Sequence, residues 1–123
     1  MPELPDGLLF VNLVDFDMVY GHRRDIAGFA SALTELDVFL SEIGPTLRDG
    51  DLLIVTADHG NDPAFRGTDH TREFVPVLVS GAGVRPGAEI GKRATFADLG
   101  ATIAEALGSP ALRSGRSFLA ALG

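Results

Sequence analysis

Cysteine is missing from this chain of 123 residues, so the chain forms no disulfide bond and offers no thiolate to a metal ion. Basic residues are scarce as well: ten Lys and Arg residues stand against 17 Asp and Glu residues, giving a net charge of −7 at pH 7. This balance supplies no positive surface for a phosphate backbone, so no nucleic-acid partner is expected. We interpret the acidity as an aid to solubility.

Long apolar runs and a basic amino terminus are also lacking. No apolar run approaches the roughly 20 residues that a membrane-spanning helix needs, so no membrane partner is expected. The opening residues, MPELPDG, lack the basic start of a secretory signal peptide. We therefore expect a soluble, cytoplasmic protein, whose 46% hydrophobic composition is ordinary for one globular domain.

Apolar patterns occur in the order strand, helix, strand, strand, helix, over residues 8–14, 26–43, 52–56, 74–79 and 96–107. The helical segments repeat apolar residues every three or four positions, whereas the strand segments are short continuous apolar runs. This order predicts an α/β fold with a mostly parallel sheet flanked by helices. A run as apolar as residues 52–55 needs strands on both sides, so we infer that part of the sheet is missing from the chain.

Local signals mark where these elements begin and end. Asp25 is a plausible N-cap for the first helix, and Gly44-Pro45 ends it. Thr95 is expected to cap the second helix, and Pro76 makes the strand around it irregular or places it near an edge. Three apolar positions are expected to lie in the core and to do nothing more: Phe10, Phe29 and Leu33.

Side chains that can bind metals gather where the predicted strands end. Asp17 and His22 follow the first strand, Asp58 and His59 follow the second, and His70 closes the loop that begins there. Sites in open α/β sheets form outside the carboxyl ends of the strands, so these residues should meet. Carboxylate and imidazole groups without thiolate suit Mn²⁺, Zn²⁺ or Fe²⁺. Five ligands exceed the need of one tetrahedral ion, which favours two ions about 3.5–4 Å apart, as in phosphoryl transfer.

The alternative is that these loop residues only form turns and caps. That interpretation suits a single histidine, but three histidines that each lie near an aspartate favour a metal site. Asp15, Asp62 and Asp69 are more typical of turns or of outer contacts than of direct ligands. Gly21 and Gly60, each beside a proposed ligand, would let the backbone approach the ions closely.

Three arginines lie beside the proposed ligands. Arg23 and Arg24 are candidates for binding a substrate phosphate through bidentate hydrogen bonds. A solvated pair at the start of a helix explains them equally well. The same two interpretations apply to Arg72.

The residues that carry this chemistry lie in three stretches: VDFDMVYGHRRD at 14–25, TADHGNDP at 56–63 and GTDHTREFVPVLV at 67–79. These stretches closely resemble the prokaryotic phosphopentomutase family of the alkaline-phosphatase-like metalloenzymes. The DHG element alone is common in that superfamily, whereas GHRRD and TDHTRE are far more specific. The resemblance extends from about Leu8 to the tail.

The resemblance implies both an activity and a ligand assignment. The family interconverts ribose 1-phosphate and ribose 5-phosphate, and the deoxyribose pair, with two Mn²⁺ ions and a phosphorylated threonine. Asp17, His22 and His70 would bind one ion, and Asp58 and His59 the other; Zn²⁺ or another divalent ion is possible. The implied fold is an alkaline-phosphatase-like core, and the implied substrate is a pentose phosphate.

The chain departs from the family in what it lacks. The family's early strand with a further Asp ligand, its phosphorylated threonine and its cap domain have no counterpart here. Residues 1–123 therefore resemble the carboxyl-terminal part of the metal-binding core domain. We expect this part to be inactive alone, with the missing amino-terminal part of the same enzyme as its partner.

Other functions are compatible with the same motifs. A cofactor-independent phosphoglycerate mutase shares DMV, GH and TADHGN-like elements, but normally lacks Tyr20 before Gly21-His22 and the run Arg23-Arg24-Asp25. A related metal-dependent phosphatase or phosphodiesterase ranks third. A metal-binding remnant without activity is the alternative that is not an enzyme.

Overall fold

The structure is a computed structural model that describes residues 6–123. It contains two compact units, one formed by residues 11–82 and the other by residues 83–123 with the described residues before 11. Among residues 6–123, no helix is both long and apolar enough to cross a bilayer.

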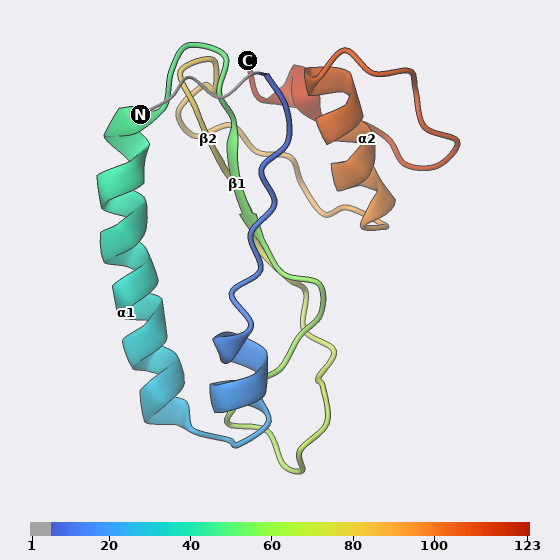
Figure 1. Cartoon of the computed structure of the whole chain (residues 1–123). Helices are drawn as coiled ribbons and strands as arrows, with labels where there is room; N and C mark the ends of the chain where they lie inside the picture. The colour runs from blue at the N-terminus through green and yellow to red at the C-terminus, as the bar shows by residue number, and fades with distance from the viewer. Residues whose placement is uncertain (1–5) are drawn as a thin grey trace. The chain divides into compact units, whose positions relative to one another are not determined.

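The unit of residues 11–82 contains the candidate ligands. A short π-helix, η1 (Phe16–Gly21), precedes the long α-helix α1 (Ile26–Ile43) and a 3₁₀ turn, η2 (Gly44–Thr46). Two strands follow, β1 (Leu53–Thr56) and β2 (Val77–Ser80), which pair along their length in Figure 1.

The local signals of α1 are confirmed. The helix runs over the predicted residues, and the Asp25 carboxylate accepts a hydrogen bond from the amide of Gly28 at 2.9 Å. The helix ends at Ile43, but Gly44 keeps right-handed dihedral angles, with φ −45°. The end therefore comes from Pro45, which has no amide hydrogen to continue the helical ladder, rather than from a left-handed glycine.

The predicted mostly parallel sheet is wrong for this chain. β1 and β2 form a two-stranded antiparallel sheet in which Leu53 faces Ser80 and Thr56 faces Val77. The loop of residues 57–76 turns the chain straight back, and strands joined in this way pair antiparallel, since parallel neighbours need a crossover connection. β2 begins immediately after Pro76, consistent with the predicted effect of that residue.

The first apolar run, residues 8–14, forms no strand in the described structure. Leu9 is 77% exposed and Phe10 is 81% exposed, so the expected core position of Phe10 is wrong here. Leu33 on α1 is also exposed, and α1 contributes no buried residue. Phe29 does pack, edge to face, on Phe16, with ring centroids 5.2 Å apart.

The unit that includes residues 83–123 has a small, well-packed centre. It contains α2 (Ala97–Ala106) and the 3₁₀ turn η3 (Leu119–Ala121). Phe118 and Leu122 are buried, and so are two polar residues of α2, Asp98 and Thr102. Helix α2 begins at Ala97, two residues after the predicted cap, and the Thr95 hydroxyl accepts a hydrogen bond from the Ala97 amide at 3.2 Å.

Candidate metal centre

Asp17 and His22 are brought together by the π-helical turn η1. Residues five apart in an α-helix would point roughly 140° apart around its axis. In η1 the amide of His22 donates instead to the carbonyl of Asp17 at 2.9 Å, and this wider turn brings the two side chains to the same side. His22 Nε2 lies 3.4 Å from Asp17 Oδ1. The sequence predicts a loop here, and the structure replaces it with this turn.

His59 and His70 are brought together by the hairpin. Because β1 and β2 are antiparallel, the end of β1 lies beside the start of β2. An isolated bridge continues this pairing, with the Thr71 amide donating to the Gly60 carbonyl at 3.0 Å. A Cβ atom at Gly60 would lie 2.7 Å from the Thr71 carbonyl oxygen, so a larger residue would push the two chain segments apart. Glycine is needed for this approach.

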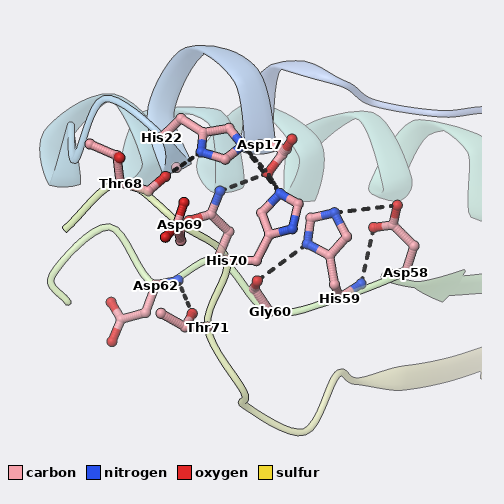
Figure 2. A network of polar contacts seen from close by, with 12 residues as sticks. Asp17, His22, Asp58, His59, Gly60, Asp62, Thr68, Asp69, His70 and Thr71 are labelled. Carbon is pink, nitrogen blue, oxygen red and sulfur yellow. Dashed lines mark hydrogen bonds and ion pairs between the residues drawn. The ribbon is translucent and has the colours of Figure 1, made fainter. Parts of the chain in front are cut away.

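Three ligand atoms form a small triangle. Asp17 Oδ1 lies 3.2 Å from His70 Nε2, and His70 Nε2 lies 3.1 Å from His22 Nε2. With the 3.4 Å from Asp17 to His22, the three edges are nearly equal. The His59 ring stacks on that of His70, with centroids 3.7 Å apart and planes inclined by 20°. Figure 2 shows these side chains converging from η1 and from the 57–76 loop.

Backbone carbonyls set the orientation of two of the rings. His22 Nδ1 is hydrogen-bonded to the carbonyl of Thr68, and His59 Nδ1 to the carbonyl of Gly60 at 3.2 Å. A carbonyl only accepts, so Nδ1 carries the hydrogen and, in the neutral ring, Nε2 keeps its lone pair. In His22 this lone pair belongs to the nitrogen of the triangle. Such carbonyl partners are typical of metal-binding histidines.

Asp17 supplies the negative charge of the cluster. Partial burial raises the pKa of Asp17. A hydrogen bond from Asn61 and the neighbouring rings of His22, His70 and His59 together lower this pKa by more than burial raises it. The net effect holds the pKa of this carboxyl below its ordinary value, so Asp17 is ionised at neutral pH.

Asp58 stands apart from the other predicted ligands. Its side chain is 83% exposed, and Oδ2 lies 3.5 Å from His59 Nε2. In Figure 2 it lies beyond His59, away from Asp17. The atoms of Asp17, His59 and His70 lie within 4.8 Å of one another and could hold one ion, a group that does not include Asp58.

The chemistry of this donor set fits a divalent ion. Bonds of about 2.0–2.1 Å to a tetrahedral ion separate neighbouring ligands by roughly 3.3 Å, which matches the triangle of Asp17, His22 and His70. With Nδ1 of His22 bonded to a carbonyl, Nε2 of the neutral ring and Asp17 Oδ1 face each other as two acceptors, and a cation between them would stabilise this arrangement. Carboxylate and imidazole groups suit Mn²⁺, Fe²⁺ or Zn²⁺, and the arrangement does not select one of them.

The predicted arginines occupy three different settings. Arg23 is exposed, whereas the guanidinium of Arg24 donates to backbone carbonyls around the cluster. Arg72 lines an open surface hollow together with His70, Phe65 and neighbouring residues. Arg72 therefore shares a surface hollow with the candidate ligand His70.

Sequence reasoning missed Asn61, whose side-chain amide donates to Asp17 Oδ1 at 2.6 Å. The available signal was its position directly after Asp58-His59-Gly60. Gly21 lies against Asn61, since a Cβ there would lie 2.5 Å from the Asn61 amide nitrogen. The turn role predicted for Asp62 is confirmed, since its carboxylate accepts from the Ala64 amide at 2.8 Å.

Known proteins are similar to this chain over most of its length. A family model described as "Metalloenzyme superfamily" matches residues 2–111. The chain is 58% identical to the phosphopentomutase of Symbiobacterium thermophilum over 112 residues. The matched region covers 91% of the chain and 28% of that protein. The identity is 62% over 115 residues to a Methylobacterium phosphopentomutase, covering 94% of the chain and 28% of that protein. For a Chelativorans phosphopentomutase it is 59% over 123 residues, with coverages of 99% and 30%. The chain thus spans less than a third of the length of these relatives.

Proposed function

We propose that this chain, which belongs to the Metalloenzyme superfamily, forms the carboxyl-terminal part of the metal-binding core domain of a phosphopentomutase. The enzyme would interconvert ribose 1-phosphate and ribose 5-phosphate, and the corresponding deoxyribose phosphates, in the cytoplasm. The observation that carries the proposal is the convergence of Asp17, His22 and His70 in a chain 58% identical to a phosphopentomutase.

The proposed ligands divide into two sets. Asp17, His22 and His70 would hold one Mn²⁺ ion, and their nearly equal separations support this assignment. Asp58 and His59 would contribute to a second ion, with further ligands from outside these residues. When bound, the ions would stabilise negative charge on the transferred phosphoryl group. The chain's own part is to supply the Asp17 carboxylate and to hold the rings of His22 and His59 through their Nδ1 hydrogen bonds.

The remaining machinery would come from residues outside this chain. The amino-terminal part of the enzyme would supply the phosphorylated threonine and one further Asp ligand. Two observations support this division: the chain spans 28–31% of its relatives, and residues 8–14 expose a long apolar surface. The chain alone would therefore not turn over substrate.

A chimera tests the proposal. These 123 residues would replace the corresponding part of the Symbiobacterium thermophilum phosphopentomutase, and conversion of ribose 1-phosphate to ribose 5-phosphate would be followed with Mn²⁺. We expect activity in the chimera, none in the isolated chain, and none in a chimera carrying Asp17→Asn. A chimera that binds Mn²⁺ but does not interconvert the pentose phosphates would contradict the proposal.

The same chimera distinguishes a phosphopentomutase from the main alternative, a cofactor-independent phosphoglycerate mutase. The shared name of the relatives supports a phosphopentomutase over a phosphoglycerate mutase. We expect no mutase activity on 3-phosphoglycerate under conditions in which ribose 1-phosphate is converted. The opposite preference would favour the phosphoglycerate mutase instead.

A further inference from the structure

Arg24 adopts an unusual backbone conformation for a non-glycine residue, with φ +54°. Residues other than Gly, Asn and Asp rarely adopt this left-handed backbone conformation. They keep it only where the surrounding structure holds them. The surroundings of Arg24 are unusually extensive. Its guanidinium reaches back to η1 and across to residues 61–69 of the loop that carries His70.

Five acceptors surround the guanidinium of Arg24, and three of them share the two hydrogens of Nη1. Nη1 donates to the carbonyl of Asp62 at 2.7 Å and to that of Gly21 at 3.2 Å. Nη2 donates to the carbonyl of Asp69 at 2.6 Å, and Nε donates to that of Gly67. The fifth acceptor is Asn61 Oδ1, 2.8 Å from Nη1. The donor fork is thus directed at the protein itself, which leaves little of it for a substrate phosphate.

Asn61 connects this arginine to the metal cluster. Its Oδ1 accepts from Arg24, so its Nδ2 must be the atom that faces Asp17. Nδ2 donates to Asp17 Oδ1 at 2.6 Å, and Oδ1 is the carboxylate atom of the ligand triangle. The contact with Arg24 therefore fixes which way the Asn61 amide points, and the amide fixes Asp17.

We propose that Arg24 and Asn61 are positioning residues that hold Asp17 and the His70 segment in metal-binding geometry. Arg24 joins the carbonyl of Asp69, the residue before His70, to the carbonyl of Gly21, the residue before His22. Asn61 then aligns the carboxylate with both rings. This inference rests on the metal-binding part of the proposed function, and it does not depend on the identity of the substrate.

The left-handed conformation of Arg24 supplies a discriminating variant. Glycine adopts a positive φ without steric cost, so Arg24→Gly removes the guanidinium and also removes backbone strain. This variant therefore distinguishes a residue that positions ligands from one that only stabilises the fold. For a positioning residue, the apo chain keeps its melting temperature while its affinity for Mn²⁺ falls.

The test measures Mn²⁺ binding to the 123-residue chain by isothermal titration calorimetry, with circular dichroism and melting curves of each apo variant. We expect Arg24→Gly and Asn61→Leu to weaken binding about 10- to 100-fold, as the loss of an outer partner of a metal ligand typically does. Arg24→Lys should not restore it, because an ammonium group cannot reproduce the planar fork. The matched control is Arg23→Gly, the neighbouring and exposed arginine, which should bind as the wild type does.

Two results would overturn the inference. One is an Arg24→Gly affinity within twofold of that of Arg23→Gly. The other is an Asn61→Leu variant that keeps both its melting curve and its full affinity. An inactive chimera that still binds Mn²⁺ would contradict the proposed function but not this inference, because the affinity is measured without substrate.

Discussion

Asp98 and Asp17 are both aspartates held among nitrogen-bearing side chains, but their surroundings differ in one decisive respect. Asp98 is only 6% exposed, and its carboxylate accepts from Arg93 Nε and from the Arg116 amide, each at 2.9 Å. Thr102 beside it donates to the Asp98 carbonyl at 2.8 Å and accepts from the Phe118 amide at 3.0 Å. Every polar atom of this group has a matched partner.

Asp17 has one matched donor, Asn61, and otherwise faces imidazole rings. Where Nδ1 of a ring is committed to a carbonyl, as in His22, the nitrogen nearest Asp17 offers a lone pair and not a hydrogen. The partners of the carboxylate distinguish the two kinds of cluster. A carboxylate whose partners are all donors stabilises a fold, whereas a carboxylate that faces other acceptors is suited to binding a cation between them.

Substituting Asp17 should have the largest effect of the predicted changes. Asp17→Asn keeps the shape of the side chain but removes the charge, and we expect at least about a 100-fold loss of Mn²⁺ affinity. The melting temperature of the apo chain should change little, because the side chain is one-third exposed at 33%. Calorimetric titration checks the affinity, with Asp15→Asn as the control. Binding within threefold of the wild type would contradict the metal assignment.

Thr102 provides the reverse case. Thr102→Val leaves the buried amide of Phe118 without its acceptor, which should cost about 1–3 kcal/mol of unfolding free energy. Thr102→Ser keeps the hydroxyl and should lose clearly less. Urea denaturation of both variants measures the difference. Mn²⁺ affinity should stay unchanged in both variants. A loss of affinity together with the loss of stability would contradict the separate roles of the two clusters.

The contribution of Asp98 to stability should depend on pH and decrease in acid. Hydrogen bonding from the Arg116 amide, opposed by burial and aided by Arg93, lowers the pKa of Asp98 below its ordinary value of 3.8. Its contribution is therefore complete above the unfolded pKa and is lost as the pH falls through the folded pKa. Asp98→Asn should flatten this acid limb in denaturation curves measured from about pH 6 down to about pH 2. An unchanged limb would mean that other carboxyl groups control acid unfolding.

The fold was predictable where its signals are local. Helix α1 has its apolar period, its Asp25 cap and Pro45 within one continuous stretch, and the structure has the helix at the predicted residues. The sheet was not predictable from the sequence, because strand pairing depends on which strands are present. Residues 52–56 have the apolar pattern of a strand buried on both faces, yet β1 has one neighbour in the described chain and pairs with it antiparallel.

The site was predictable to the level of residue types. Carboxylates and imidazoles at strand ends indicated a metal cluster, and Asp17, His22, His59 and His70 do converge. The π-helical turn was missed because six residues are too few to show a helical apolar period, so the stretch between the first strand and α1 was taken for a loop. The contacts of Arg24 and Asn61 were missed for another reason: donors to backbone carbonyls of a distant loop leave no spacing signal in the sequence.

The smallest predicted effect concerns the exposed run of residues 8–14. Phe10 is 81% exposed, so Phe10→Ser should change the unfolding free energy of this chain by no more than about 0.5 kcal/mol. In the active chimera the same substitution should lower the melting temperature by several degrees, since a strand of the complete sheet would bury this side chain. Melting curves of both proteins, each with and without the substitution, make the measurement. Equal effects in the two would mean that the run stays exposed in the complete enzyme, and the proposed place of this chain in the sheet would then be wrong.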